Sequence, residues 1–181
     1  MTRPALWLSI LSISIPFTSI ATSIAISGWF NIIDNALSDL GHAIRSPVAP
    51  IFNFGLSLGG LLISIVSTLY FGKLFRILSV CGVLVGYTLI LVAVFDEVYR
   101  SLHFTVSVAF FLSIALTLSI YAYLYKNPLA VFALILGLAS WLLHLSYGIP
   151  RGAAIPELIS IAVAIPFYID LARRIDLSTK R

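Results

Sequence analysis

Long apolar runs separated by short polar segments form the dominant pattern of the chain. Each of the six runs approaches or exceeds the length of about 20 residues that a helix needs to cross a bilayer. The runs cover approximately residues 5–27, 48–71, 77–95, 102–125, 128–148 and 155–172. The pattern therefore predicts an all-α membrane protein, in which a bundle of six transmembrane helices forms a single integral membrane domain over residues 1–181.

The ends of the runs carry signals that support these boundaries. The first run is longer than the 7–15 apolar residues of a secretory signal peptide, so we expect it to remain as the first membrane helix. Pro128 and Pro156 stand at the beginnings of the fifth and sixth runs. A proline is tolerated in the first turn of a helix, because its missing N–H has no partner within the helix.

Residues 28–47 form the longest connection between two runs, and their pattern is periodic rather than random. Apolar residues recur at steps of three or four, at Phe30, Ile33, Leu37, Leu40 and Ile44. This spacing is typical of a helix with one apolar face. We therefore expect a short interfacial helix between the first and second transmembrane helices.

The distribution of Lys and Arg predicts the orientation of the bundle. One side holds eight of these residues and the other holds three. The first group is Arg3, Lys73, Arg76, Lys126, Arg173, Arg174, Lys180 and Arg181, and the second is Arg45, Arg100 and Arg151. Because basic residues accumulate on the cytoplasmic side, we expect both termini in the cytoplasm. The expected location is the cell membrane, as a multi-pass protein of a prokaryotic plasma membrane.

Composition agrees with lipid as the main solvent. Hydrophobic residues make up 60% of the chain and charged residues 10%, and the mean hydropathy is +1.08. A soluble domain of this length could not bury so much apolar surface. The net charge of +4 is explained by basic residues beside the membrane spans, and no basic patch with interleaved aromatic residues occurs. We therefore expect membrane lipids, and not nucleic acid, as partners.

Two glycine pairs indicate close helix packing in the second and third spans. The pairs are Gly55 with Gly59 and Gly82 with Gly86, each in a G-x-x-x-G pattern. Small residues four apart allow helix backbones to approach closely in lipid. The pattern predicts packing of spans two and three within the chain, and a homo-oligomer through these faces is the alternative.

Most of the ionisable residues other than Lys and Arg converge on the predicted outer side. All three histidines and five of the seven carboxylates lie there. They are His42, His103, His144, Asp34, Asp39, Asp96, Glu97 and Glu157. Because His103 and His144 lie within apolar runs, where ionisable groups are costly and usually face the bundle interior, we predict a polar site at this face.

Residue types in this predicted site suit either metal binding or acid–base catalysis. Imidazole and carboxylate groups are typical ligands of zinc and other divalent metals, and we predict the ligand set His42, His103, His144, Asp96 and Asp39. The acid–base groups that we predict are Asp39, Asp96, Glu157 and Ser38, with Asn53 in support. The corresponding activity is a metal-assisted hydrolase or transferase that acts on a lipid or another amphiphile.

Two other functions are compatible with the same residues. The polar groups can form a structural network in a non-enzymatic lipid-binding or structural membrane subunit. His103 and His144, at similar depth on consecutive spans, can also ligate a haem. No Walker A, G-x-S-x-G or H-E-x-x-H motif occurs in the sequence, so no known catalytic motif decides whether the protein is an enzyme.

The segment "NALSDLGH", residues 35–42, contains Asp39 in otherwise apolar surroundings. An ionised carboxylate near the membrane interface is costly unless it is paired. We therefore predict that this segment folds over the outer end of the bundle and brings Asp39 close to Asp96 or His103.

Four stretches in order along the chain resemble the prokaryotic membrane family labelled domain of unknown function 998. They are "LSDLGH" (37–42), "APIFNFGLSLGG" (49–60), "FDEVYRSLH" (95–103) and "GIPRGAAIPE" (148–157). The matched positions are Ser38, Asp39, Gly41, Asn53, Phe95, Asp96 and His103. The resemblance implies six helices and an outer polar cluster, and it implies no particular activity.

The chain is also loosely similar to the membrane hydrolases that include alkaline ceramidases. Those enzymes hold zinc with three histidines, helped by Ser and Asp. This sequence has three histidines but lacks their H-x-x-x-H pair. The similarity serves only to rank a zinc hydrolase ahead of the other hypotheses.

Overall fold

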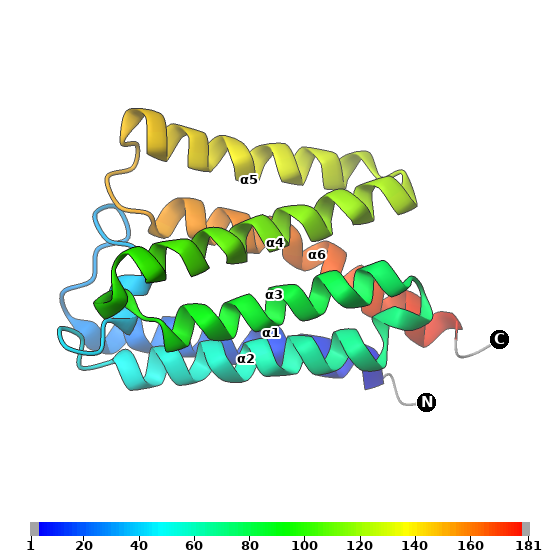
Figure 1. Ribbon diagram of the computed structural model, residues 1–181, viewed down its shortest axis with the longest axis horizontal. Helices are drawn as coiled ribbons and strands as arrows, with labels where there is room; N and C mark the ends of the chain where they lie inside the picture. Colours follow the sequence, from blue (N-terminus) through cyan, green and yellow to red (C-terminus); the bar gives the residue numbers. More distant parts are fainter. Residues whose placement is uncertain (1–3, 179–181) are drawn as a thin grey trace.

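Six long helices form a bundle, and short 3₁₀ turns occupy three of the connections (Figure 1). The computed structural model describes residues 4–178; Arg3, Lys180 and Arg181, which contribute to the charge count, lie outside this range. The helices are α1 (Pro4–Ser27), α2 (Ala49–Leu69), α3 (Arg76–Val94), α4 (Ser101–Tyr125), α5 (Pro128–Tyr147) and α6 (Ala154–Ser178). The 3₁₀ turns are η1 (Leu37–Gly41), η2 (Phe71–Lys73) and η3 (Glu97–Tyr99).

All six helices are long and apolar enough to cross a membrane, which confirms the predicted architecture. Because the number of spans is even, the two ends of the chain lie at one end of the bundle (Figure 1). We call this the terminal end. The connections 28–48, 95–100 and 148–153 lie at the opposite end, which we call the η1 end.

Local sequence explains where the helices begin and end. The Asn127 side chain accepts hydrogen bonds from the backbone N–H groups of Leu129 (2.9 Å) and Ala130 (3.3 Å), and Pro128 occupies the first helical position of α5. The Asn127 contacts cap the helix, and Pro128 stands in the first turn as the sequence predicts. At its other end, α5 stops at Gly148, which adopts a left-handed conformation with φ of 64°.

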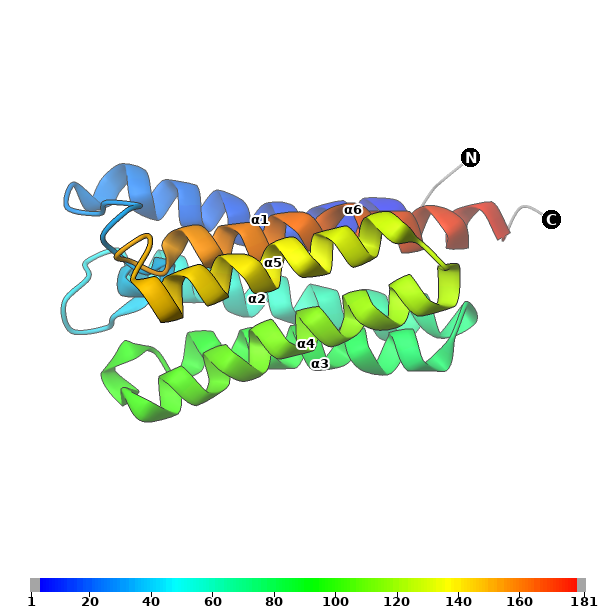
Figure 2. The same ribbon diagram turned by 90° about the horizontal axis from the view of Figure 1, so that it is seen from above.

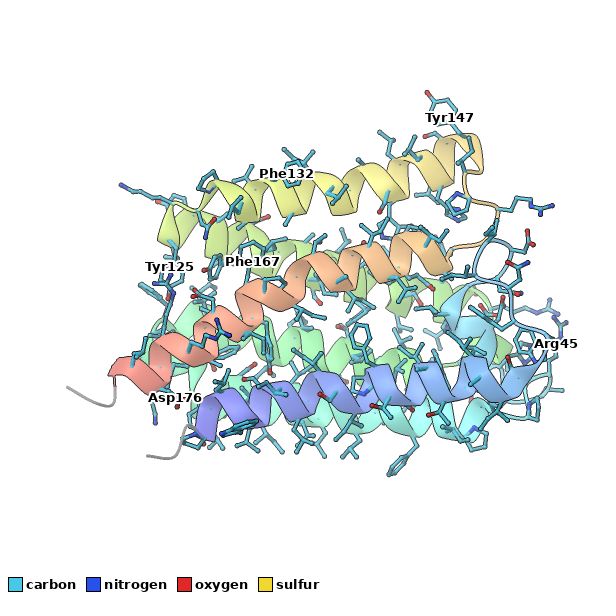
Figure 3. All side chains as sticks on the ribbon, turned by 180° about the vertical axis from the view of Figure 1, so that it is seen from behind. Arg45, Tyr125, Phe132, Tyr147, Phe167 and Asp176 are labelled. Atoms are coloured by element: carbon cyan, nitrogen blue, oxygen red, sulfur yellow. The ribbon has the colours of Figure 1, made fainter. Side chains whose placement is uncertain are left out.

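Helix α6 is longer than predicted and continues to Ser178 instead of residue 172. Asp176 is 8% exposed, and its carboxylate accepts hydrogen bonds from the backbone N–H groups of Ala5 and Leu6 at the beginning of α1. The first N–H groups of a helix have no partner within it. A carboxylate 170 residues away therefore caps α1, and this contact allows α6 to continue past the apolar run. Figure 3 shows Asp176 at the terminal end, opposite Arg45 at the η1 end.

Glycine contacts hold α1, α2 and α3 together. A methyl group on Gly60 would lie 2.5 Å from the Gly86 carbonyl oxygen, and one on Gly82 would lie 2.1 Å from the Ser67 hydroxyl. The α3 pair therefore faces α2, as predicted. Gly55 and Gly59 instead face Ser19 and Pro16 of α1. Both glycine faces are covered by helices of the same chain, so a homo-oligomer stays a prediction without an assigned surface.

Candidate functional site

The η1 segment folds over one end of the bundle. Leu37 and Leu40 are 4% and 0% exposed, and the Leu40 carbonyl accepts a hydrogen bond from Ser46 Oγ (2.7 Å). Asn53 Nδ2, from the first turns of α2, donates to the Gly41 carbonyl (2.8 Å). A methyl group on Gly41 would lie 2.5 Å from Asn53 Oδ1, so only glycine fits this approach.

The predicted interfacial helix is present but shorter and tighter than the periodicity indicated. Helical structure covers Leu37–Gly41, and turns occupy much of the rest of the connection. Ile33 and Ile44 are 51% and 79% exposed, although the spacing placed them on the buried face. Of the five apolar positions, Leu37 and Leu40 are buried in the core and Phe30 packs partly against it. Ile33 and Ile44 do not join them, because five residues of 3₁₀ helix cannot extend one apolar face over four turns.

Asp39 stabilises the turn that contains it. Its Oδ2 accepts hydrogen bonds from Asn35 Nδ2 (2.9 Å) and from the Ala36 backbone N–H (3.0 Å). The carboxylate is only partly exposed, and it interacts with the carboxyl group of Glu97 from η3. The structure therefore assigns Glu97 to Asp39 as an ionisable neighbour, and the approach of Asp39 to Asp96 or His103 stays a prediction.

Glu97 connects η1 to η3. Its Oε1 accepts a hydrogen bond from Ser38 Oγ (2.8 Å). Burial and, after it, contact with the Asp39 carboxyl group raise the pKa of Glu97 to about 7. Glu97 therefore titrates near neutral pH, which is the property required of a general acid or base.

Glu157 brings a third carboxyl group to the same place from the first turn of α6. It is 8% exposed, and its Oε2 accepts a hydrogen bond from the Leu37 backbone N–H (2.7 Å). Its carboxyl group is near enough to those of Asp39 and Glu97 for like-charge repulsion. We call Asp39, Glu97 and Glu157 the acidic cluster.

Asp96 and His103 are buried beside this cluster, each held by local hydrogen bonds. Asp96 Oδ1 accepts from the Val98 backbone N–H (2.8 Å) and so caps η3. His103 Nδ1 lies 2.7 Å from the Phe95 carbonyl oxygen, so this nitrogen carries a proton and donates. Nε2 is 3.3 Å from Ser107 Oγ. Both side chains are 8% exposed.

The other two histidines make separate contacts. His42 Nδ1 accepts hydrogen bonds from the backbone N–H groups of Ile44 and Arg45, both at 3.3 Å. His144 Nδ1 donates to the Pro150 carbonyl oxygen (2.8 Å). Within residues 4–178, no group of three or more His, Cys, Asp or Glu side chains is arranged to hold a metal ion. The predicted binding of zinc or another divalent metal therefore stays a prediction, as does haem ligation by His103 and His144.

Asp34 lies outside the acidic cluster. Its Oδ1 forms a salt bridge with Arg151 (2.6 Å). Backbone hydrogen bonds run alongside, from Gly152 N–H to the Ile33 carbonyl (2.7 Å) and from Ala154 N–H to the Asn35 carbonyl (3.0 Å). The connection before α6 is therefore attached to the connection before η1, which positions Glu157 beside Leu37.

A groove of about 610 Å³ extends from the acidic cluster along α4, α5 and α6. Its ionisable lining residues all come from the η1 end: Glu97, Arg100, His103, His144 and Glu157. The remaining walls are mainly apolar, with Phe111, Leu118 and Leu134 among them. Helices α4 and α5 are close together at the Lys126 turn and diverge towards the η1 end in both views (Figures 1 and 2).

A second cavity of about 160 Å³ lies deeper in the bundle and is also mainly apolar. It shares Ser38, Ser107 and Glu157 with the groove. These polar side chains therefore line both spaces. They lie near the η1 end, where the lateral groove and the interior cavity approach each other.

Sequence reasoning placed Ser38, Asp39 and Glu157 in the site but did not select Glu97. The available signal was its position directly after Asp96 in the polar stretch "DEVYRS". Whether Asp96 or Glu97 faces Ser38 depends on the 3₁₀ turn of η3, in which Asp96 is the capping residue and Glu97 the first residue of the turn. The periodicity of the flanking α-helices does not determine this choice.

Fold and site together define a polytopic membrane protein of six helices, with a lateral groove that ends in a cluster of carboxyl groups. The chain belongs to the family described as "Protein of unknown function (DUF998)", whose model matches residues 10–174. The match covers most of the chain and confirms the resemblance found in the sequence. No curated protein and no solved structure matches the chain, and the looser similarity to alkaline ceramidases has no support.

Proposed function

We propose that the protein binds a membrane amphiphile in the groove between α4, α5 and α6. One observation carries the proposal: the ionisable lining residues of the groove all lie at the η1 end, and the remaining walls are mainly apolar. This arrangement matches a molecule with one polar head and one hydrocarbon chain. The volume of about 610 Å³ lies in the range of small-molecule sites, roughly 300–1,000 Å³.

The physical reason for selective binding lies at the polar end. A hydrocarbon chain gains little by moving from lipid to an apolar groove, because lipid tails are as apolar as the side chains. Buried polar groups, in contrast, are costly when they lack partners. A head group that hydrogen-bonds to Glu97, Glu157 or the histidines therefore supplies most of the preference over bulk lipid.

The exposed side chains along the walls of the groove allow an amphiphile to enter it from the bilayer. Phe104 on α4 and Leu145 on α5 are 65% and 70% exposed, and both line the groove. In a membrane, such large apolar side chains contact lipid. An amphiphile therefore enters sideways from the leaflet at the η1 end. We infer that this leaflet is the outer one and that both termini are cytoplasmic, on the Lys and Arg distribution.

The experiment is to fill the groove and measure bound lipid by native mass spectrometry. Gly137 lines the groove, and the nearest atom to an added methyl group would be Ser160 Oγ at 3.7 Å. Gly137→Leu therefore occupies the space of the hydrocarbon chain without a direct clash at Cβ. We expect it to lose the lipid that copurifies with the wild type. Gly72→Leu, outside the groove, is the matched control and should retain it. Equal lipid retention in both variants would contradict the proposal.

A second candidate function is acid–base catalysis on the bound amphiphile, as a hydrolase or transferase. The specific observation that favours it is the hydrogen bond from Ser38 Oγ to Glu97 (2.8 Å), at the polar end of the groove. A carboxyl group with a pKa of about 7 is suited to accept or return a proton at neutral pH. Turnover of a fluorogenic, uncharged lipid ester should then be lost in Glu97→Gln while the ester itself still binds.

Metal binding and haem binding can each be tested independently of acid–base catalysis. Metal analysis of protein purified without chelators tests whether Asp39, Asp96 and the three histidines bind a divalent ion. Less than roughly a tenth of an equivalent would remove the metal-assisted mechanism, because a catalytic site must be occupied to act. Absence of a Soret band after expression with haem would remove haem ligation by His103 and His144.

A further inference from the structure

The polar end of the groove brings the carboxyl groups of the acidic cluster together without a basic side chain of the described residues paired to them. Glu157 is 8% exposed and Glu97 is partly exposed, and Asp39 lies directly behind them. Among residues 4–178, salt bridges join Arg151 to Asp34 and Arg174 to Asp170, and none includes a member of the acidic cluster. The cluster therefore lacks a paired cation.

The basic residues nearby do not supply that cation. Arg100 lines the groove but is exposed, and Arg45 is exposed on the η1 connection. Arg45 lowers the pKa of Glu97 only as the smallest of its influences. Exposed guanidinium groups are screened by water and contribute little to a buried carboxylate. Glu157 is buried, and its one hydrogen bond within the described part of the chain comes from Leu37 N–H.

We propose that the groove takes a single-chain amphiphile of the surrounding leaflet with a cationic ammonium head, whose nitrogen lies between Glu97 and Glu157. This inference rests on the proposed function and specifies its ligand. An ammonium group supplies the missing positive charge. A phosphate or carboxylate head would add a negative charge beside the cluster, and a neutral alcohol would leave the carboxylates uncompensated.

The mainly apolar lining beyond the polar end indicates the rest of the ligand. Groove-lining residues of α4, α5 and α6 continue past the cluster towards mid-bundle, to Leu118, Ala133 and Val163. Exposed side chains of α4 and α5 that line the groove, among them Phe104 and Leu145, connect this path to lipid. A ligand that reaches the site through lipid carries its chain along these walls, so the source is the bilayer and not the aqueous phase.

The test compares three probes with the same chain in non-ionic detergent micelles at pH 8, above the pKa of Glu97 of about 7. The probes are hexadecyltrimethylammonium, hexadecyl phosphate and hexadecanol, and the readout is the dissociation constant. We expect the ammonium probe to bind at least about tenfold tighter than the other two, as for a buried charge pair. Because its charge is fixed, its affinity does not depend on an amine pKa.

Two variants connect that preference to the cluster. Glu157→Gln should weaken binding of the ammonium probe by roughly tenfold or more and leave hexadecanol binding unchanged. Glu97→Gln, on the connection and not in a transmembrane helix, provides the same comparison if Glu157→Gln fails to fold. Asp170→Asn is the control, because Asp170 is a carboxylate at the terminal end that pairs with Arg174 outside the groove. It should bind the ammonium probe like the wild type.

The outcomes separate the two proposals. Equal affinity for all three probes, abolished by Gly137→Leu, would overturn the ammonium preference while supporting the groove. Tighter binding of hexadecyl phosphate, or ammonium affinity unaffected by both glutamine variants, would also overturn the preference. No saturable binding of any probe would overturn the proposed function, and the head-group assignment with it.

Discussion

Replacing Glu97 by glutamine should remove a pH dependence of stability that one carboxyl group creates. Burial raises the pKa of Glu97 from its ordinary value of 4.5 to about 7. The folded protein therefore holds this proton more tightly than the unfolded chain. The proton on Glu97 therefore stabilises the folded protein. This stabilisation is complete below pH 4.5 and is lost as pH rises through about 7.

The magnitude comes from the same two values. One proton changes stability by at most about 1.4 kcal/mol per pH unit, so the interval from pH 4.5 to 7 gives an upper limit of about 3.5 kcal/mol. Partial exposure of Glu97 reduces this to about 1–2 kcal/mol. Glutamine resembles the protonated carboxyl group, since it still accepts from Ser38 Oγ and can donate an N–H to Asp39.

The assay is unfolding of the detergent-solubilised protein at several pH values between 5 and 8. Other carboxyl groups titrate in both proteins, so the informative quantity is the difference between wild type and Glu97→Gln. The two should converge near pH 5, and the variant should be more stable by about 1–2 kcal/mol at pH 8. Asp34→Asn, the control at the same end, should keep the wild-type profile. A constant difference across this range would refute the assignment of a near-neutral pKa to Glu97.

Three further predictions concern the bundle and its orientation. Gly60→Ala should destabilise the protein by about 1–3 kcal/mol, because its methyl group would lie 2.5 Å from a backbone oxygen of α3. Gly137→Ala is the control and should be neutral, because the nearest atom to its methyl group is at 3.7 Å. Equal unfolding midpoints for the two variants would contradict the packing argument. Asp176→Ala should cost about 1–2 kcal/mol by leaving buried N–H groups of α1 without an acceptor, and unchanged thermal stability would show that the cap is dispensable. In intact cells, a membrane-impermeant thiol reagent should label Ser101→Cys and spare Ser178→Cys, and the reverse pattern would invert the orientation.

The amino-acid sequence by itself determined the architecture, because lipid imposes a simple rule. A membrane-crossing segment must satisfy its own backbone and be apolar over about 20 residues, and both properties are local. The helix starts at Pro128 and near Pro156 were equally readable, since capping and proline geometry act within one turn. Packing of α2 against α3 was predicted from Gly82 and Gly86, which do face α2. The family match over residues 10–174 agrees with the ordered motifs found in the sequence.

The members of the site could be predicted only in part. Ser38, Asp39, Glu157 and Asn53 lie together at the η1 end, where the sequence placed them, because rare polar residues in an apolar chain are conspicuous; their roles stay predictions. Their partners were not predictable. Ser38 meets Glu97 across 59 positions, and Leu37 meets Glu157 across 120. No local periodicity carries such information, because these contacts depend on how the three connections at the η1 end fit together.

Tertiary structure also decided how His103 lies relative to Asp96 and which helix Gly55 and Gly59 contact. Asp96 and His103 are seven positions apart, which is two turns of an ideal helix, but η3 and the positive φ of Arg100 (48°) interrupt the helix between them. Gly55 and Gly59 pack on α1 and not on α3, since a G-x-x-x-G face specifies close approach but not the approaching helix. Sequence determines which residues are able to be buried together; the packed bundle determines which of them meet, because each long-range contact depends on the positions of all the helices around it.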